Sequence, residues 1–334
     1  MMNLNSFYIH GRVINDDVLH IYNTASGIEF NACAYFIKVI MKTIPKQKDE
    51  AWMKVIIDND YDHPVDLKVS KEEKEFVLYS SSSKEQHNIK LLKASEAIES
   101  YVDIIDININ GDYLDKPKYD KTFLVFGDST VSGYGNLGHL TDEKTLFDTD
   151  GLLGYAFLTA KEFNASMSSV NGSGWGLCFS PWTTPKRRPL LALYDKVAPL
   201  STLPYDIKTI KPTLALISLG TNDSYYIIEG EENKTKEDLE KEFKKDYKVL
   251  LELIKRDYGN IPVIMVYGVL RERHNYQLMH EVFLENKDSF NLYEACFEGD
   301  GMGVSGHPTY ISHKEISLKL IELIKVIDSE RCDN

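Results

Sequence analysis

The sequence predicts an α/β protein in two parts: an all-β, jelly-roll-like sandwich, then a three-layer α/β/α domain with a mostly parallel sheet. Up to about residue 118 there are strand patterns and almost no helical period, whereas later apolar strand runs alternate with amphipathic helices. The chain has 334 residues, more than one core usually organises. The polar stretch 114–121, which contains Pro117, separates the two patterns. We therefore expect domains at 1–118 and 119–334.

The first part contains short runs rich in β-branched and aromatic residues, separated by clusters of turn residues. The serine run at 80–83 is one such cluster, and we interpret it as a loop. Many short strands at this spacing are typical of an antiparallel sandwich or jelly roll. The expected strands are 7–14, 18–22, 28–34, 35–43, 52–57, 75–79 and 102–109.

The second part alternates expected strands at 122–126, 167–170, 213–219, 262–269 and 290–297 with helices at about 151–163, 235–257, 275–286 and 312–327. The clearest helix begins at Thr235, whose hydroxyl is an N-cap with Asp238 three residues later, and ends before Gly259. Its apolar residues recur at steps of three and four, which places one face on a sheet. This alternation indicates a parallel sheet with helices on both faces.

The overall charge argues against two classes of partner. The formal net charge is -13 and the pI is near 5.2, which disfavours nucleic acid and anionic membrane surfaces. No stretch approaches the roughly 18 uninterrupted apolar residues of a membrane span, and residues 1–30 lack a basic segment followed by an apolar one. We therefore expect a cytoplasmic protein. Its oligomeric state is not predicted.

Three polar residues follow separate segments of the second part. Ser129 comes after the strand run and Gly127-Asp128, Asn222 comes after the next central run, and His307 lies between Gly306 and Pro308. Because parallel strands end at one edge of a sheet, these side chains are expected to meet there. A nucleophile, an oxyanion donor and a base are the groups that acyl transfer requires.

Each of these residues also has a structural explanation when it is considered alone. A serine after Gly-Asp often caps a turn, an asparagine often forms an Asx-turn, and the glycine-rich stretch 171–176 is explained by an ordinary loop. The appearance of four such segments in order favours the catalytic interpretation.

The second part resembles the SGNH, or GDSL-type, hydrolases in the order of four motifs. These are Gly-Asp-Ser at 127–129, Gly172, Gly-Thr-Asn-Asp at 220–223 and His-Pro at 307–308. The stretches 127–135 and 154–162, with the β-rich first part, resemble carbohydrate esterase family 2 more specifically. The resemblance implies a jelly roll joined to an SGNH hydrolase domain that removes acetyl groups from plant-polysaccharide sugars. It implies no metal and no organic cofactor.

The resemblance also implies roles for individual residues. Ser129 would be the nucleophile and His307 its base, and the backbone N–H groups of Ser129 and Gly172 with the Asn222 amide would form the oxyanion hole. Many SGNH enzymes have an aspartate three residues before the histidine, and Val304 stands there in this sequence. We expect a backbone carbonyl of the same loop to orient His307, with Asp300 as the alternative.

The roles of other residues near these segments have two interpretations. The aromatic residues that border the expected active-site strands are candidates for stacking on sugar rings, or for core packing; they are Tyr134, Trp175, Trp182 and Tyr267. Asp128 and Asp223 are expected to hold turn amides. His313, on the last helix, is expected to be a surface or packing residue.

The predicted activity is that of a carboxylic ester hydrolase. We expect an O-acetyl esterase of the acetylxylan or acetylmannan type, with an acetylated hemicellulose-derived oligosaccharide as its partner. Two alternatives stay open: a lipase or thioesterase-type hydrolase on the same fold, and a carbohydrate-binding protein with an inactive hydrolase domain. The sequence does not indicate which sugar or hydroxyl is deacetylated, or whether the β part binds glycan.

Overall fold

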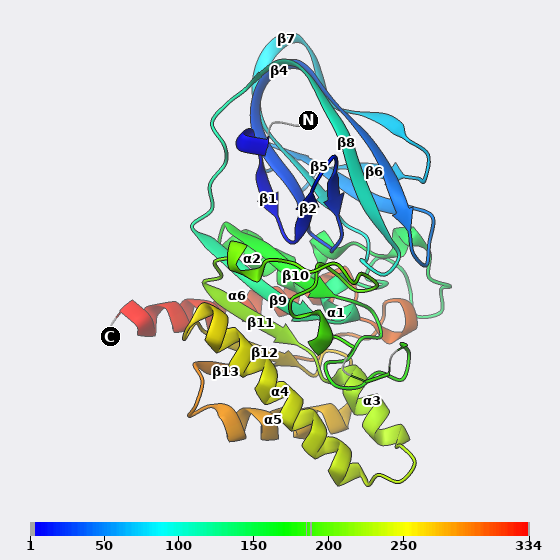
Figure 1. The fold of residues 1–334 in the computed structure, drawn as a ribbon, viewed down its shortest axis with the longest axis vertical. Helices are drawn as coiled ribbons and strands as arrows, with labels where there is room; N and C mark the ends of the chain where they lie inside the picture. The colour runs from blue at the N-terminus through cyan, green and yellow to red at the C-terminus, as the bar shows by residue number, and fades with distance from the viewer. Residues whose placement is uncertain (1–3, 185, 188, 333–334) are drawn as a thin grey trace.

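The computed structural model describes residues 4–184, 186–187 and 189–332. Within them, an antiparallel sheet formed by the N-terminal part lies against an α/β part (Figure 1). The second part contains a sheet in the order β10-β9-β11-β12-β13, with every neighbouring pair parallel. The parallel sheet and the antiparallel pairing of the first part are confirmed. The jelly-roll topology and the domain boundary stay predictions.

The N-terminal sheet has the strand order β2-β3-β8-β4-β7-β5-β6, with β1 paired to β4. Long strands form its centre, where β4 lies between β7 and β8. The strands are β1 (Tyr8–His10), β2 (Val13–Asn15), β3 (Leu19–Ile21), β4 (Gly27–Pro45), β5 (Ala51–Ile57), β6 (Val65–Val69), β7 (Lys74–Lys93) and β8 (Ser100–Tyr113).

Several strand predictions in this part were wrong in their bounds. The serine run at 80–83 was expected to be a loop but lies within β7: Ser80 pairs with Phe36 of β4, residues 81–84 bulge out of the ladder, and pairing resumes between Glu85 and Ala34. The expected strand at 7–14 is divided at Gly11, which has a φ of +73°. Gly11 also lies so close to Ser26 that a Cβ atom added to the glycine would be 2.7 Å from the Ser26 Cβ. The two expected strands at 28–34 and 35–43 are one strand, β4, which continues through a bulge where they were expected to separate.

The parallel sheet carries an apolar core on each face. Along β9, Phe123 and Val125 point to one core, and Leu124 and Phe126 point to the other. Helices α2 and α6 cover the first face, and α4 and α5 cover the second. The strands are β9 (Lys121–Gly127), β10 (Ala165–Asn171), β11 (Leu214–Ser218), β12 (Val263–Tyr267) and β13 (Leu292–Cys296).

The helices of this part agree with the predicted alternation, with two additions: the short helix α1 and helix α3. The helix from Thr235 is confirmed: Thr235 and Asp238 form a capping box, and Gly259 follows the last turn. Helix α3 was not predicted, because Gly220-Thr221-Asn222 reads as the loop after a strand. The helices are α1 (Ser129–Ser132), α2 (Tyr155–Glu162), α3 (Thr221–Glu229), α4 (Lys236–Tyr258), α5 (Arg273–Asn286) and α6 (Tyr310–Cys332).

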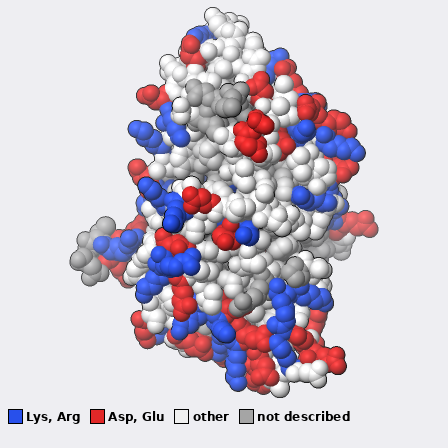
Figure 2. Space-filling model, viewed as in Figure 1, with Lys and Arg blue, Asp and Glu red and all other residues white. Residues whose placement is uncertain are grey.

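Charged side chains of both signs are mixed on the face shown in Figure 2. They are dense at the lower end, over α4 and α5, and sparser across the middle of the molecule (Figure 2). Among the described residues, no helix is both long enough and apolar enough to cross a bilayer.

Candidate active site

The predicted site residues meet at the carboxyl edge of the parallel sheet. Ser129 follows β9, Gly172 follows β10, Asn222 follows β11 within α3, and His307 lies between β13 and α6. The chain passes from β9 to β10 on one side and then to β11 on the other, so strand order reverses at β9. Open α/β sheets place their ligand sites at such a reversal.

Ser129 is the first residue of α1, and Asp128 caps that short helix. The Asp128 carboxylate accepts from the Thr130 backbone N–H and hydroxyl, each at 2.9 Å. Both Asp128 and Ser129 are buried. Asp128 therefore holds the amide of the turn, as expected. The turn also places the Ser129 hydroxyl at the end of strand β9.

His307 lies between the serine and a backbone carbonyl. Its Nε2 is 2.8 Å from the Ser129 Oγ, and its Nδ1 is 3.1 Å from the Val304 carbonyl oxygen. A carbonyl only accepts, so Nδ1 carries the hydrogen and Nε2 is free to accept from the serine hydroxyl. The turn depends on Ser305, whose φ of 55° lies in the left-handed region.

The carboxylate of Asp300 is engaged elsewhere in the same loop. It accepts from the Thr309 N–H at 2.9 Å, the Met302 N–H at 3.2 Å and the Thr309 hydroxyl. The structure thus has the Val304 carbonyl, and not the alternative acid Asp300, beside Nδ1 of His307. Val304 lies three residues before His307, and it is the backbone of that residue that makes the contact.

The environment of His307 favours the neutral imidazole. The pKa of His307 is lowered to about 4, chiefly by burial and also by the positive charge of Lys144, although the hydrogen bond to the Val304 carbonyl acts to raise it. The histidine is therefore unprotonated near neutral pH, which is the state in which Nε2 accepts a proton.

The side chain of Asn222 is fixed by three groups. Its Nδ2 donates to the Trp175 carbonyl at 3.2 Å and to Asp128 at 3.4 Å, and its Oδ1 accepts from the Trp182 indole N–H at 3.2 Å. These contacts direct the amide N–H groups toward the strand end that carries Ser129.

Gly172 is held close to its neighbours. A Cβ at this position would lie 3.0 Å from the Trp175 ring. Its N–H donates to the Gly127 carbonyl at 3.3 Å, so this group has a protein partner in the structure, in contrast with the free oxyanion donor that the sequence suggested.

Asp223 anchors the loop that follows β10. Its carboxylate accepts from the backbone N–H groups of Leu177, Cys178 and Phe179 at 2.9, 2.7 and 2.7 Å. Asp223 is fully buried, and these three bonds fasten the loop that carries Trp175 to helix α3. This is the turn-holding role that the sequence suggested.

A cavity of about 870 Å³ opens over Ser129 and His307. Three of the four predicted aromatics contribute to its wall: Tyr134, Trp175 and Trp182. Trp182 is 63% exposed, and the Tyr134 ring lies 4.4 Å from the imidazole of His307, centroid to centroid. The sequence did not single out the other wall residues, which include Gln47, Ile98, Tyr225, Leu270 and Ser305.

Two candidates lie away from this cavity. Tyr267 packs in the core beneath α4 and α5, and its hydroxyl donates to Glu294 at 2.7 Å. Of its two proposed roles, Tyr267 therefore has the packing role. His313 is fully buried, and its Nδ1 accepts from the Tyr155 N–H at 3.2 Å, which makes it a packing residue and not a surface one.

The chain matches known families over both of its parts. Residues 9–117 match the family described as Carbohydrate esterase 2 N-terminal, and residues 123–291 match the GDSL-like Lipase/Acylhydrolase family. The second match spans half of the chain.

Curated relatives cover the chain to different extents. "Cellulase/esterase CelE" of Acetivibrio thermocellus is 25% identical over 316 residues, which are 90% of this chain and 37% of that protein. "Acetylxylan esterase / glucomannan deacetylase" of Cellvibrio japonicus is 33% identical over 135 residues, 39% of this chain and 38% of that protein. The matched part of this chain thus spans less than two fifths of each relative.

Solved structures share the fold of the whole chain. A family two carbohydrate esterase from Clostridium thermocellum, solved in complex with cellohexaose, superposes with a TM-score of 0.84 at 23% identity, covering 97% of this chain and 99% of that one. The family expected from the sequence motifs is thereby confirmed. The chain belongs to the GDSL-like lipase/acylhydrolase family and carries, ahead of its hydrolase part, a domain of the carbohydrate esterase 2 N-terminal family.

Proposed function

We propose that this protein is a carbohydrate O-acetyl esterase in which Ser129 and His307 work as a dyad. One observation carries the proposal: the Ser129 Oγ lies 2.8 Å from His307 Nε2, while Nδ1 of the same ring faces the Val304 carbonyl. This arrangement selects the tautomer that accepts the serine proton, and it does so at the wall of an open cavity.

The reaction follows from these positions. The Ser129 oxygen attacks the acetyl carbonyl as its proton passes to His307 Nε2, and the carbonyl oxygen becomes an oxyanion. The bond to the sugar oxygen then breaks, and His307 returns the proton to that oxygen, which leaves an acetyl group on Ser129. Water attacks this acetyl-enzyme with the same proton transfers in turn, releasing acetate.

Donors near the serine would stabilise the oxyanion. The Asn222 amide is aimed at this region, and its long 3.4 Å bond to Asp128 is the one that an oxyanion would replace. The Ser129 N–H, at the start of α1, lacks an intrahelical partner because it lies in the first turn. Gly172 would contribute only by sharing its bond to Gly127.

The substrate we propose is an acetylated oligosaccharide of the mannan or xylan type. The cavity is wide and open, and the exposed ring of Trp182 offers a surface on which a sugar ring can stack. The Cellvibrio relative is named for acetylxylan and glucomannan, and the Clostridium structure holds cellohexaose. Gln47 and Ile98 of the N-terminal part belong to the wall of the cavity, so we propose that this part shapes the cleft.

The test is acetate release from acetylated xylan and mannan oligosaccharides, followed by NMR. The wild-type protein is expected to release acetate, and Ser129→Ala is expected to lower kcat by at least about 1,000-fold, because a dyad that loses its nucleophile retains only binding and oxyanion stabilisation. Unchanged acetate release by Ser129→Ala would sink the mechanism. A marked preference for long-chain acyl esters would instead favour the lipase or thioesterase alternative.

A further inference from the structure

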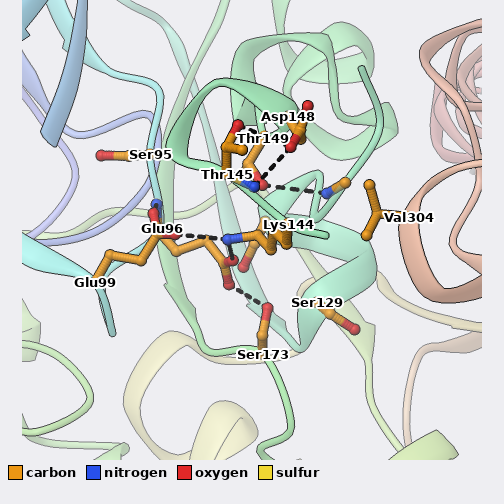
Figure 3. Close-up of polar contacts among 12 residues, drawn as sticks. Ser95, Glu96, Glu99, Ser129, Lys144, Thr145, Asp148, Thr149, Ser173 and Val304 are labelled. Atoms are coloured by element: carbon orange, nitrogen blue, oxygen red, sulfur yellow. Dashed lines mark hydrogen bonds and ion pairs between the residues drawn. The ribbon is translucent and has the colours of Figure 1, made fainter. Parts of the chain in front are cut away.

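A buried ion cluster joins the N-terminal part to the rim of the cavity. Glu96 and Glu99 lie in the segment between β7 and β8, and their side chains are only 1% and 4% exposed. The ammonium group of Lys144 lies 3.1 Å from Glu96 and 2.5 Å from Glu99. Figure 3 shows Lys144 pointing away from its own loop toward these two carboxylates. Two nearly buried carboxylates need a cation beside them, because their mutual repulsion is otherwise unscreened.

On one side, the cluster contacts the catalytic histidine through an aromatic ring. The Lys144 ammonium lies 4.7 Å from the centroid of the Tyr134 ring, within the range of a cation–π contact. That ring in turn lies 4.4 Å from the imidazole of His307. Lys144, Tyr134 and His307 are therefore linked by consecutive contacts, the last of which is with the proposed base.

On the other side, the cluster contacts the loop after β10. The Ser173 hydroxyl donates to the Glu96 carboxylate (Figure 3), and Ser173 is the residue next to Gly172. Lys93 fixes the backbone of the acidic segment, because its buried ammonium donates to the Ser95 and Glu96 carbonyls at 3.0 and 2.7 Å. One carboxylate thus holds Lys144 and the glycine-rich loop together.

The segment that carries Lys144 is tied to the histidine loop. The Thr145 hydroxyl donates to Asp148, and the Thr149 hydroxyl accepts from the Gly135 N–H at 3.1 Å. The Gly135 carbonyl accepts from the Val304 N–H at 3.1 Å. Val304 is the residue whose carbonyl faces His307, so this segment and the histidine loop form one connected structure.

We propose that Glu96 and Glu99 form a clamp on Lys144 that positions Tyr134 against His307 and holds the Ser173 loop. Lys144 is then a positioning residue, and the N-terminal part contributes to turnover as well as to the wall of the cleft. The proposal rests on the esterase function proposed above. Neither the lysine nor the two glutamates touches the reacting atoms in this account.

The charge of Lys144 gives the proposal an independent signature. The groups that face His307 are Ser129, Tyr134, Lys144 and the buried His313, with Glu96 and Glu99 behind Lys144. Lys144 acts to lower the pKa of His307. Removing its charge raises this pKa, so the acid limb of kcat/KM moves to higher pH. Exposure of the ring to water would move the limb the same way, because burial also lowers this pKa. The substitution must therefore keep the packing, which a methionine of similar length does while it removes the charge.

The experiment compares Lys144→Met with Lys144→Arg in acetate release from an acetylated xylan oligosaccharide. Lys244→Met is the matched control, because Lys244 is 20% exposed and also contacts two glutamates, Glu281 and Glu285, at 2.8 and 2.7 Å on α4 and α5. We expect Lys144→Met to lower kcat by about 10-fold with a smaller change in KM, because the base is displaced while Trp182, the exposed ring proposed to stack on the sugar, stays in place. Lys144→Arg keeps the charge and should recover most of kcat and the wild-type acid limb.

Equal kcat values and pH profiles for Lys144→Met and Lys244→Met would overturn the proposal. If Lys144→Met does not fold, Ser173→Ala tests the same clamp by removing one hydroxyl, and a wild-type kcat for that variant counts against it. Failure of the esterase function is seen separately, because the wild-type protein would then release no acetate or Ser129→Ala would release it normally.

Discussion

His307 contacts a neutral carbonyl at the position where many catalytic histidines contact an acid. The Val304 oxygen accepts from both the backbone N–H and the Nδ1 of His307. A carbonyl selects the tautomer as an aspartate does, but it provides no negative charge to stabilise imidazolium. Burial therefore outweighs the hydrogen bond to the carbonyl, and the pKa of the ring is lowered.

The pH dependence of turnover follows from this environment. Burial disfavours the charged ring and lowers the pKa of His307 to about 4, so the base stays neutral until the pH falls to that region. We expect the acid limb of kcat/KM for acetate release to have its midpoint well below pH 6.5, the ordinary value for histidine. A midpoint at or above 6.5 would show that this description of the ring is wrong.

Asn222 provides a second test at the scale of one residue. Replacing it with alanine removes the amide that we propose as an oxyanion donor, and we expect kcat to fall by about 100- to 1,000-fold. The control is Asn286→Ala, which removes a buried asparagine of α5 that donates to the Val282 carbonyl. Equal kcat values for the two variants would contradict this role of Asn222.

The positions of some site residues could be predicted from the sequence, and those of others could not. Ser129, Asn222 and His307 each stand directly after a recognisable apolar run or glycine, so their meeting was predictable. Which of the aromatics would face the cavity was not, because Trp182 and Tyr267 both border the strands and only packing separates them. The contact between Lys144 and Glu96 joins distant segments and leaves no local pattern.

At the scale of elements, helix α3 does two tasks. It presents Asn222 to the site and, through Asp223, fastens the loop that follows β10. Asp223→Ala would leave three buried backbone N–H groups without an acceptor. We expect the free energy of unfolding to fall by roughly 3–5 kcal/mol, measured by urea denaturation.

The control for this prediction is Asp238→Ala, which removes an exposed carboxylate from the capping box of α4. A cap of this kind contributes about 1 kcal/mol. If Asp223→Ala is no more destabilising than Asp238→Ala, the three bonds to the loop do not contribute as we describe.

The elements themselves were predictable to the extent that their patterns were local. The capping box at Thr235 and the stripe that follows it identified α4 almost to the residue. In contrast, the serine run at 80–83 is part of β7 because the flanking residues on both sides pair with β4, and intrinsic preference does not report such a partner. Helix α3 was missed because its first residues serve the site and resemble a loop.

At the scale of the molecule, the two parts share a core. Ala25, Ile56, Leu92 and Ala94 of the N-terminal part belong to the apolar cluster on one face of the parallel sheet. Polar contacts reinforce this interface: Asn23 donates to the Val197 carbonyl at 2.8 Å, and the fully buried Arg12 donates to the Leu193 carbonyl at 3.1 Å.

We therefore expect the two parts to unfold together. Separating them would expose the shared cluster and leave Arg12 without its carbonyl partners, so neither part is stable by itself. Differential scanning calorimetry should give one transition whose calorimetric and van't Hoff enthalpies agree. Two resolved transitions would contradict the shared core.

The central claim is that Ser129 attacks the acetyl group, and rapid acid quenching tests it most directly. The wild-type protein is mixed with an activated acetate ester, quenched within one turnover and digested for mass spectrometry. We predict an acetyl group on the peptide that contains Ser129, and none in Ser129→Ala. Release of acetate at the wild-type rate with no acetyl group on Ser129 at any time would contradict the account.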